Sequence, residues 1–154
     1  MTLRPAAALT LLGASAVVAG GLVAAVTGPF DWTKGSWAAA YLVLVVGVAQ
    51  YVMGGMRARH TGHGQAPALG WVQVGTWNLG SALVIGATLA GRPLLVDAGS
   101  VLLVVALVIA LRATRTGPSA PTGPPTLIAW GYRAMLLVLA VSIPVGMLLS
   151  HLRH

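Results

Sequence analysis

Five long apolar stretches dominate this sequence, and each can cross the hydrocarbon core of a membrane as a helix. They cover residues 5–26, 37–53, 71–90, 94–111 and 127–149. A core of ~30 Å requires about 20 helical residues, with roughly 17 to 25 usual. The stretches show no alternation of polar and apolar residues, and backbone inside lipid must satisfy its own hydrogen bonds. We therefore predict helices rather than strands.

The composition agrees with a protein whose solvent is lipid. Mean hydropathy is +0.87, and only 7% of the residues are charged, against roughly 25% in a soluble domain. The chain has no glutamate, and its two acidic residues are Asp31 and Asp97. These features predict an all-α fold: a polytopic integral membrane helical bundle in which residues 1–154 form a single transmembrane domain.

The formal net charge of +7 does not indicate a nucleic-acid partner. The nine basic residues occur singly or in pairs, and no basic stripe of the kind that follows phosphates is present. Positively charged segments flanking membrane spans explain the charge better. The chain has no cysteine, which excludes disulfides, thiolate metal sites and cysteine nucleophiles.

Basic residues also predict the orientation, because cytoplasmic segments carry an excess of Lys and Arg. With the N-terminus inside, the segments on the cytoplasmic side hold Arg4, Arg57, Arg59, Arg112 and Arg115, and the opposite side holds Lys34, Arg92 and Arg153. This asymmetry favours an N-in, C-out topology with flexible cytoplasmic loops at 54–70 and 112–126. We expect the first stretch to be a retained helix rather than a cleaved leader. The preference for Arg over Lys suggests a GC-rich bacterial genome, hence a bacterial plasma membrane.

Small residues mark the expected helix contacts, because helices in lipid associate through close backbone approach. Three of the predicted helices carry such a face. The faces are Gly13, Ala16, Gly20 and Ala24; Ala40, Gly47, Gln50 and Gly54; and Gly75, Asn78, Ala82, Gly86 and Ala90. The helix at 94–111 has the weakest face of this kind, so we expect it to be the most exposed to lipid.

Three polar residues inside the spans are predicted to lie at one depth, in the cytoplasmic half. They are Gln50, Asn78 and Arg133, with Trp77 and Tyr132 nearby. Polar groups at such depth are functional candidates, and this cluster could bind a lipid head group, a carboxylate or a partner's polar side chain. The alternative is structural: Gln50 and Asn78 form interhelical hydrogen bonds, and Arg133 extends to the phosphates.

Asp97 is the only acidic residue in or near a span. Isolated acids of this kind can couple the movement of protons or cations. Asp97 could instead pair with Arg92 or Lys34, or stabilise the start of its helix through the helix dipole.

The histidines do not suggest a metal or haem site. His60 and His63 have the spacing of a metal-binding pair, as do His151 and His154. Five spans would place the two pairs on opposite sides of the membrane, and neither has a carboxylate or cysteine nearby to complete the coordination. We predict no metal and no other cofactor.

The function expected from these features is that of a non-catalytic accessory subunit or scaffold that packs against itself or against other membrane subunits. An enzyme is disfavoured because general acid–base catalysis requires positioned carboxylates or histidines. Two alternatives stay open. One is a small-solute or ion transporter or channel, and the other is a protein that binds lipid or a hydrophobic ligand in the cytoplasmic half of the bundle.

Overall fold

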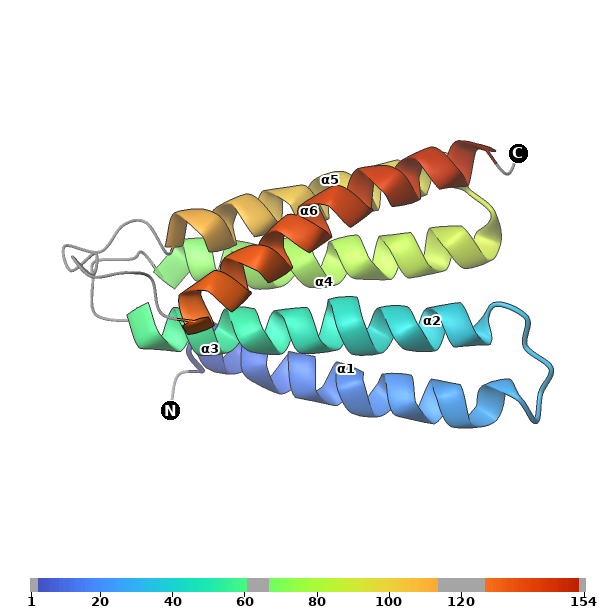
Figure 1. Cartoon of the computed structure of the whole chain (residues 1–154), viewed down its shortest axis with the longest axis horizontal. Helices are drawn as coiled ribbons and strands as arrows, with labels where there is room; N and C mark the ends of the chain where they lie inside the picture. The colour runs from blue at the N-terminus through green and yellow to red at the C-terminus, as the bar shows by residue number, and fades with distance from the viewer. Residues whose placement is uncertain (1–2, 61–66, 114–126, 153–154) are drawn as a thin grey trace. The chain divides into compact units, whose positions relative to one another are not determined.

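The computed structural model describes residues 3–60, 67–113 and 127–152, and every regular element in these ranges is a helix (Figure 1). Side chains of the last helix are described over residues 130–143. In chain order the elements are α1 (Pro5–Thr27), α2 (Gly35–Tyr41), the π-helix η1 (Leu42–Ala49), α3 (Gln50–His60), α4 (Pro67–Ala90), α5 (Pro93–Ala113) and α6 (Leu127–Leu152). The predicted all-α class is confirmed for the described residues.

Three helical segments of the described chain have the length and apolar composition needed to cross a membrane. They are Pro5–Thr27, Gly35–Arg59 and Pro93–Ala113, and a shorter apolar stretch covers Trp130–Ile143. Helix α4 is long enough to span, but Gln73, Thr76 and Asn78 lower its hydropathy. The three apolar segments fit a membrane protein.

The second predicted helix is longer than its apolar stretch. Elements α2, η1 and α3 follow one another without a break, so this helix runs over residues 35–60 rather than 37–53. Residues 54–60, predicted to begin a loop, are therefore helical. Helix α4 likewise begins earlier, at Pro67, where a proline is well suited to the first turn because its missing N–H has no partner to lose. Residues 61–66 and 114–126 of the predicted loops lie outside the described residues.

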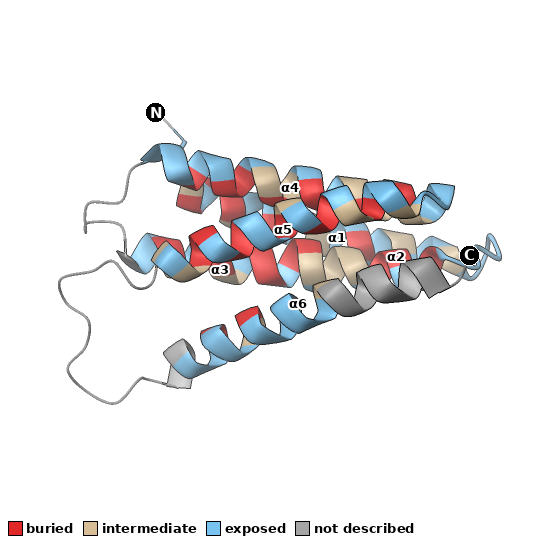
Figure 2. Cartoon of the chain, turned by 90° about the horizontal axis from the view of Figure 1, so that it is seen from above, coloured by how far each residue is buried: buried red, intermediate tan, exposed pale blue. Residues whose placement is uncertain are grey.

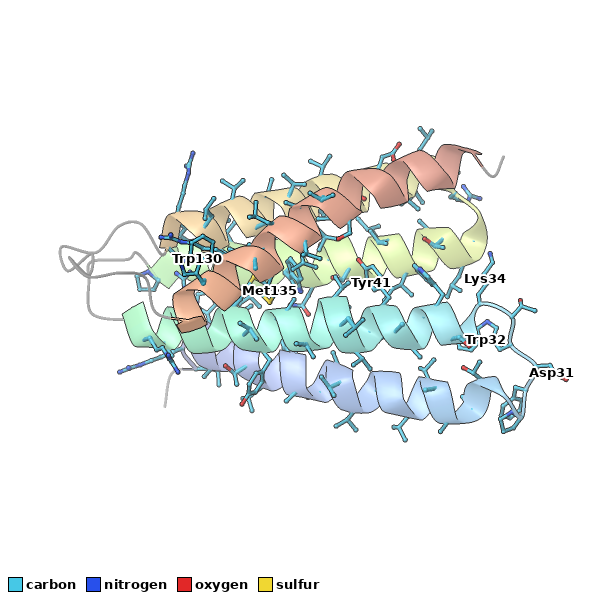
Figure 3. All side chains as sticks on the ribbon, viewed as in Figure 1. Asp31, Trp32, Lys34, Tyr41, Trp130 and Met135 are labelled. Carbon is cyan, nitrogen blue, oxygen red and sulfur yellow. The ribbon has the colours of Figure 1, made fainter. Side chains whose placement is uncertain are left out.

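The turn between α1 and α2 closes the first helix with a left-handed residue. Asp31 has φ 46°, and its N–H bonds to the carbonyl of Gly28 at 3.1 Å, while the N–H of Trp32 bonds to the carbonyl of Thr27 at 3.1 Å. This pair of hydrogen bonds defines a Schellman motif. Figure 3 shows Asp31 and Trp32 in this turn, with Lys34 at its far end.

The turn between α4 and α5 is shorter and also closes the preceding helix with a residue of positive φ. Gly91 has φ 65°, and the N–H of Arg92 bonds to the carbonyl of Ala87 at 2.9 Å. Pro93 then begins α5. Because glycine adopts a positive φ without steric cost and proline cannot continue α4, the sequence Gly-Arg-Pro enforces the predicted antiparallel hairpin.

The chain divides into two compact units, Met1–Gly55 and Met56–His154. In the first unit α1 runs beside the helix formed by α2, η1 and the first part of α3. A Cβ on Gly13 would lie 2.6 Å from the backbone nitrogen of Tyr51, and one on Gly54 would lie 2.7 Å from that of Thr10. The two backbones therefore touch, and only glycine fits at these positions.

Most residues of the two predicted faces in this unit are indeed buried. Gly13, Gly20, Gly47, Gln50 and Gly54 are enclosed. Ala24 and Ala40, at the ends of these faces, are exposed. The contact faces predicted from small residues are thus confirmed in the middle of the contact between α1 and the helix formed by α2, η1 and α3.

In the second unit the predicted face of α4 is wrong. Gly75, Ala82, Gly86 and Ala90 are exposed, and a Cβ on Gly75 or Gly86 would meet nothing within 4 Å. The residues that α4 buries are Gly70, Gln73, Val74, Trp77, Gly80, Ser81, Val84 and Ala87. A polar side chain is costly in lipid, so α4 turns Gln73 inward, whereas a small residue can face either lipid or protein.

The expectation that the helix at 94–111 faces lipid most is also wrong. Helix α5 contacts α4 extensively and also contacts α6. Figure 2 shows buried residues at intervals along α5. It buries Gly99, Ser100, Leu103 and Ala106, among others. Gly99 allows α4 to approach, and Leu102 and Leu103 lie against Gly80 beside that contact.

Candidate functional site

The buried face of α4 carries three polar side chains on successive turns. Gln73, Trp77 and Ser81 are spaced by four residues, and their exposed fractions are 1%, 0% and 2%. Residues spaced by four lie on one side of a helix, one above the other. Their side chains therefore follow a line along one side of α4, about 12 Å long at the rise of an α-helix.

Arg57 meets this line at its Gln73 end. The Arg57 guanidinium donates a hydrogen bond from Nη1 to Oε1 of Gln73 at 2.9 Å, and both side chains are buried. A hydrogen bond with a charged donor is stronger than one between neutral groups. Tyr132 of α6 is also buried, and its hydroxyl lies within electrostatic range of the guanidinium.

The other two members of the line have polar atoms without partners. Trp77 Nε1 and Ser81 Oγ are buried, and neither has a hydrogen-bond partner among the described residues. An unsatisfied buried donor or acceptor costs about 1–3 kcal/mol. Since native proteins satisfy most buried polar groups, these two atoms identify a place where an additional hydrogen-bonding molecule would be stabilising.

Two polar residues of α5 lie at or near the level of Ser81. Gly99 faces Gly80 across the α4–α5 contact, so Ser100, which is buried, lies at about the level of Ser81. Asp97 precedes Ser100 by three residues, about one turn nearer the Gly91 turn, and buries one carboxylate oxygen. We call this set the polar file: Arg57, Gln73, Trp77, Ser81, Ser100 and Asp97.

The structure separates the residues of the predicted cluster by environment. Trp77 and Tyr132 are buried, whereas Arg133 is exposed, as expected for a side chain that extends away from the bundle. Asn78 is half-buried, and its Nδ2 donates to the carbonyl of Val74 in its own helix at 2.8 Å. In unit 2, then, the enclosed cation near Tyr132 is Arg57 and not Arg133.

Gln50 belongs to the first unit and is fully buried. Neither atom of its carboxamide has a hydrogen-bond partner among the described residues. The proposed common depth of Gln50 with Asn78 and Arg133 stays a prediction.

The sequence analysis does not identify Arg57, Gln73, Ser81 or Ser100 as site residues. Gln73 was identifiable, because it is a polar residue in an apolar stretch, as Gln50 and Asn78 are, and lies one helical turn from Trp77. Arg57 falls in the predicted loop 54–70, because the apolar stretch ends at Met53, whereas the helix continues to His60.

The described residues contain no group of three His, Cys, Asp or Glu side chains that could hold a metal ion. His63 and His154 lie outside the described residues, as do the side chains of His60 and His151. No protein-family model, curated protein or solved structure matches this chain.

Proposed function

We propose that this chain is an integral protein of a bacterial plasma membrane, with five spans, a cytoplasmic N-terminus and an external C-terminus. The three long apolar helical segments support insertion, and α4 and α6 supply the other two spans. The direction in which α5 crosses the membrane follows from the excess of basic residues expected on the cytoplasmic side. That rule places Arg112 inside and Arg92, in the Gly91 turn, outside.

Within this membrane we propose a non-catalytic role as an accessory or scaffold subunit that acts through helix contacts. One observation carries the proposal: glycines at close backbone contacts, Gly13 and Gly54 in the first unit and Gly80 and Gly99 in the second, join the helices within each unit, and large apolar side chains remain exposed. Leu22 of α1 is 65% exposed and Leu137 of α6 is 66% exposed. In water such faces would be a liability. In a membrane they contact lipid, a second copy or another subunit.

Photo-crosslinking tests this role. A benzophenone side chain at position 22 or 137 is expected to trap a defined protein partner, either another subunit or a second copy. The matched control is position 9, because Leu9 is fully buried in the same helix as Leu22 and should yield only intramolecular products. Lipid adducts alone at both exposed positions, together with a monomeric native mass, would contradict the subunit role.

A further inference from the structure

Four aromatic residues gather around the turn between α1 and α2. Phe30 and Trp32 lie in the turn, and Trp37 and Tyr41 follow on α2. We propose that these four residues, the aromatic cluster, bind the phospholipid headgroup layer at the membrane surface where the turn emerges, and thereby fix the depth of the first unit in the bilayer. The inference rests on the proposed membrane insertion and deepens it, because it assigns a lipid partner to this turn.

The position of the turn follows from the two helices that it joins. Pro5–Thr27 and Gly35–Arg59 are both long and apolar enough to cross a membrane. In the first unit they pack side by side, and only residues 28–34 separate them in the sequence. A bilayer that both helices cross must therefore have one of its surfaces at this turn, where the solvent changes from acyl chains to water.

The aromatic rings at this level are exposed. Phe30 is 77% exposed, and Trp32 and Trp37 are exposed as well. Single exposed apolar residues are common on any protein, whereas large apolar side chains gathered in one patch indicate an interaction surface. An indole combines an apolar body with an N–H donor, which suits the headgroup layer, where acyl chains and polar oxygens meet.

The backbone of the turn holds Phe30 and Trp32 in this exposed position. The N–H of Phe30 bonds to the carbonyl of Val26 at 3.2 Å, and the N–H of Trp32 bonds to that of Thr27 at 3.1 Å. At the other end, the N–H of Gly35 bonds to the carbonyl of Trp32 at 2.8 Å. Gly35 also packs so closely against the Thr27 side chain that a Cβ would collide with it. Because this contact fills the inside of the turn, the aromatic side chains have no room there.

Trp37 and Tyr41 extend the cluster along α2. Their ring centroids are 5.4 Å apart, and a spacing of four residues places them on one side of the helix. Figure 3 shows Trp32 at the turn and Tyr41 farther along this helix. The distance from the start of α2 at Gly35 to Tyr41 is about 9 Å at the rise of an α-helix. One headgroup layer is roughly 5–8 Å thick, so the cluster covers this layer and reaches the edge of the hydrocarbon core.

A spin-label depth measurement tests the anchor, and the absence of cysteine allows a single label. Thr33 is exposed in the same turn, so a nitroxide on Thr33→Cys reports the depth of the turn and leaves every ring in place. In phosphatidylcholine vesicles the label should collide with both oxygen, which is concentrated among acyl chains, and a water-soluble nickel chelate. Adding Phe30→Ser should raise the nickel collision rate at least twofold, because the turn moves toward water. Phe30→Leu is the matched control and should keep the original rate, because leucine is also apolar.

The two variants at position 30 should fold alike. Their circular dichroism and thermal midpoints in detergent should match, because the Phe30 side chain is exposed. An unchanged nickel collision rate in Phe30→Ser, or an equal rise in Phe30→Leu, would overturn the anchor. A label at position 33 that neither oxygen nor nickel reaches would also overturn it, because protein rather than lipid would then cover the turn.

Val18 separates failure of this inference from failure of membrane insertion. Its side chain is 65% exposed, and it lies about 14 Å before Thr27, where α1 ends. If α1 crosses the bilayer, a label on Val18→Cys lies in the hydrocarbon core and collides far more often with oxygen than with nickel. A label on Val18→Cys that nickel reaches freely would refute insertion itself. Oxygen access at position 18 together with a turn that does not respond to Phe30→Ser would refute the aromatic anchor alone.

Discussion

Gly80 of α4 and Gly99 of α5 face each other reciprocally, and a Cβ built on either would lie 2.8 Å from the carbonyl oxygen of the other. Neither carbonyl can move aside without breaking its own helix. We predict that Gly80→Ala or Gly99→Ala destabilises the protein by ~1–3 kcal/mol, the range for overpacking a close contact. Thermal unfolding in detergent, followed by circular dichroism, measures the loss.

The same helix provides the control for this prediction. Gly75 and Gly86 have open space where a Cβ would lie. Alanine is a better helix former than glycine by about 1 kcal/mol, so Gly75→Ala and Gly86→Ala should be neutral or stabilising. If all four variants lose the same stability, the Gly80–Gly99 contact is not what holds the hairpin together.

The buried hydrogen bond between Arg57 and Gln73 predicts strong coupling between these two residues. Arg57→Leu should cost stability because it leaves the Gln73 carboxamide oxygen without its donor. Gln73→Leu should also cost stability, because the guanidinium loses the acceptor that lies 2.9 Å from its Nη1. The double variant should be less destabilised than the sum of the single variants, by about 0.5–3 kcal/mol. A double-mutant cycle of unfolding midpoints measures this difference, and strict additivity would count against the contact.

Asp31 predicts a gain in stability from a loop substitution. Its φ of 46° is a conformation that glycine adopts freely, and its carboxylate lies at the C-terminal end of α1, where the helix dipole disfavours negative charge. Asp31→Gly should be neutral or stabilising by about 0.5–1 kcal/mol, and Asp31→Val should lose about 1–2 kcal/mol. Asp31→Asn separates the two effects, because asparagine removes the charge and still tolerates the left-handed backbone. Greater stability of the valine variant than of the glycine variant would contradict the assignment.

The absence of cysteine makes the proposed topology directly testable. Single substitutions Lys34→Cys and Arg92→Cys should react with a membrane-impermeant maleimide in intact spheroplasts. Arg59→Cys and Arg112→Cys should react only after lysis, because the excess of positive charge is expected on the cytoplasmic side. Labelling of Lys34→Cys and Arg112→Cys from the same side would refute the five-span arrangement.

The helices of this chain were predictable because the length of an apolar run is a property of a whole segment and does not depend on any single residue. Apolar runs of sufficient length identify five helical segments, and the Gly91-Arg92-Pro93 sequence identifies a hairpin. The ends were less well predicted, because hydropathy marks where a helix leaves lipid and not where it stops. Helix α3 continues beyond Met53 for this reason, and Arg57 was assigned to a loop.

Which face a helix buries proved harder to predict than the helix itself. Small residues correctly identified Gly13, Gly20 and Gly47 in the first unit, where backbones touch. In α4 the same rule selected Gly75 and Gly86, which are exposed. Glycine permits close approach but does not require it, so a face defined by size alone is ambiguous. The positions of Gln73 and Ser81 on the opposite face predict the buried face better, because exposing a polar side chain to lipid costs free energy.

The π-helix η1 gives the first unit a place where chain length can change. Its hydrogen bonds span five residues rather than four, so each turn contains surplus backbone. Deleting one residue there, such as Val45, can be absorbed by a return to α-helical winding, which keeps Gly54 directed toward α1. The same deletion in α1, at Ala14, has no such reserve and would rotate every later side chain by about 100°. Relatives of this protein that differ by one residue in the second helix should therefore carry the insertion or deletion within Leu42–Ala49.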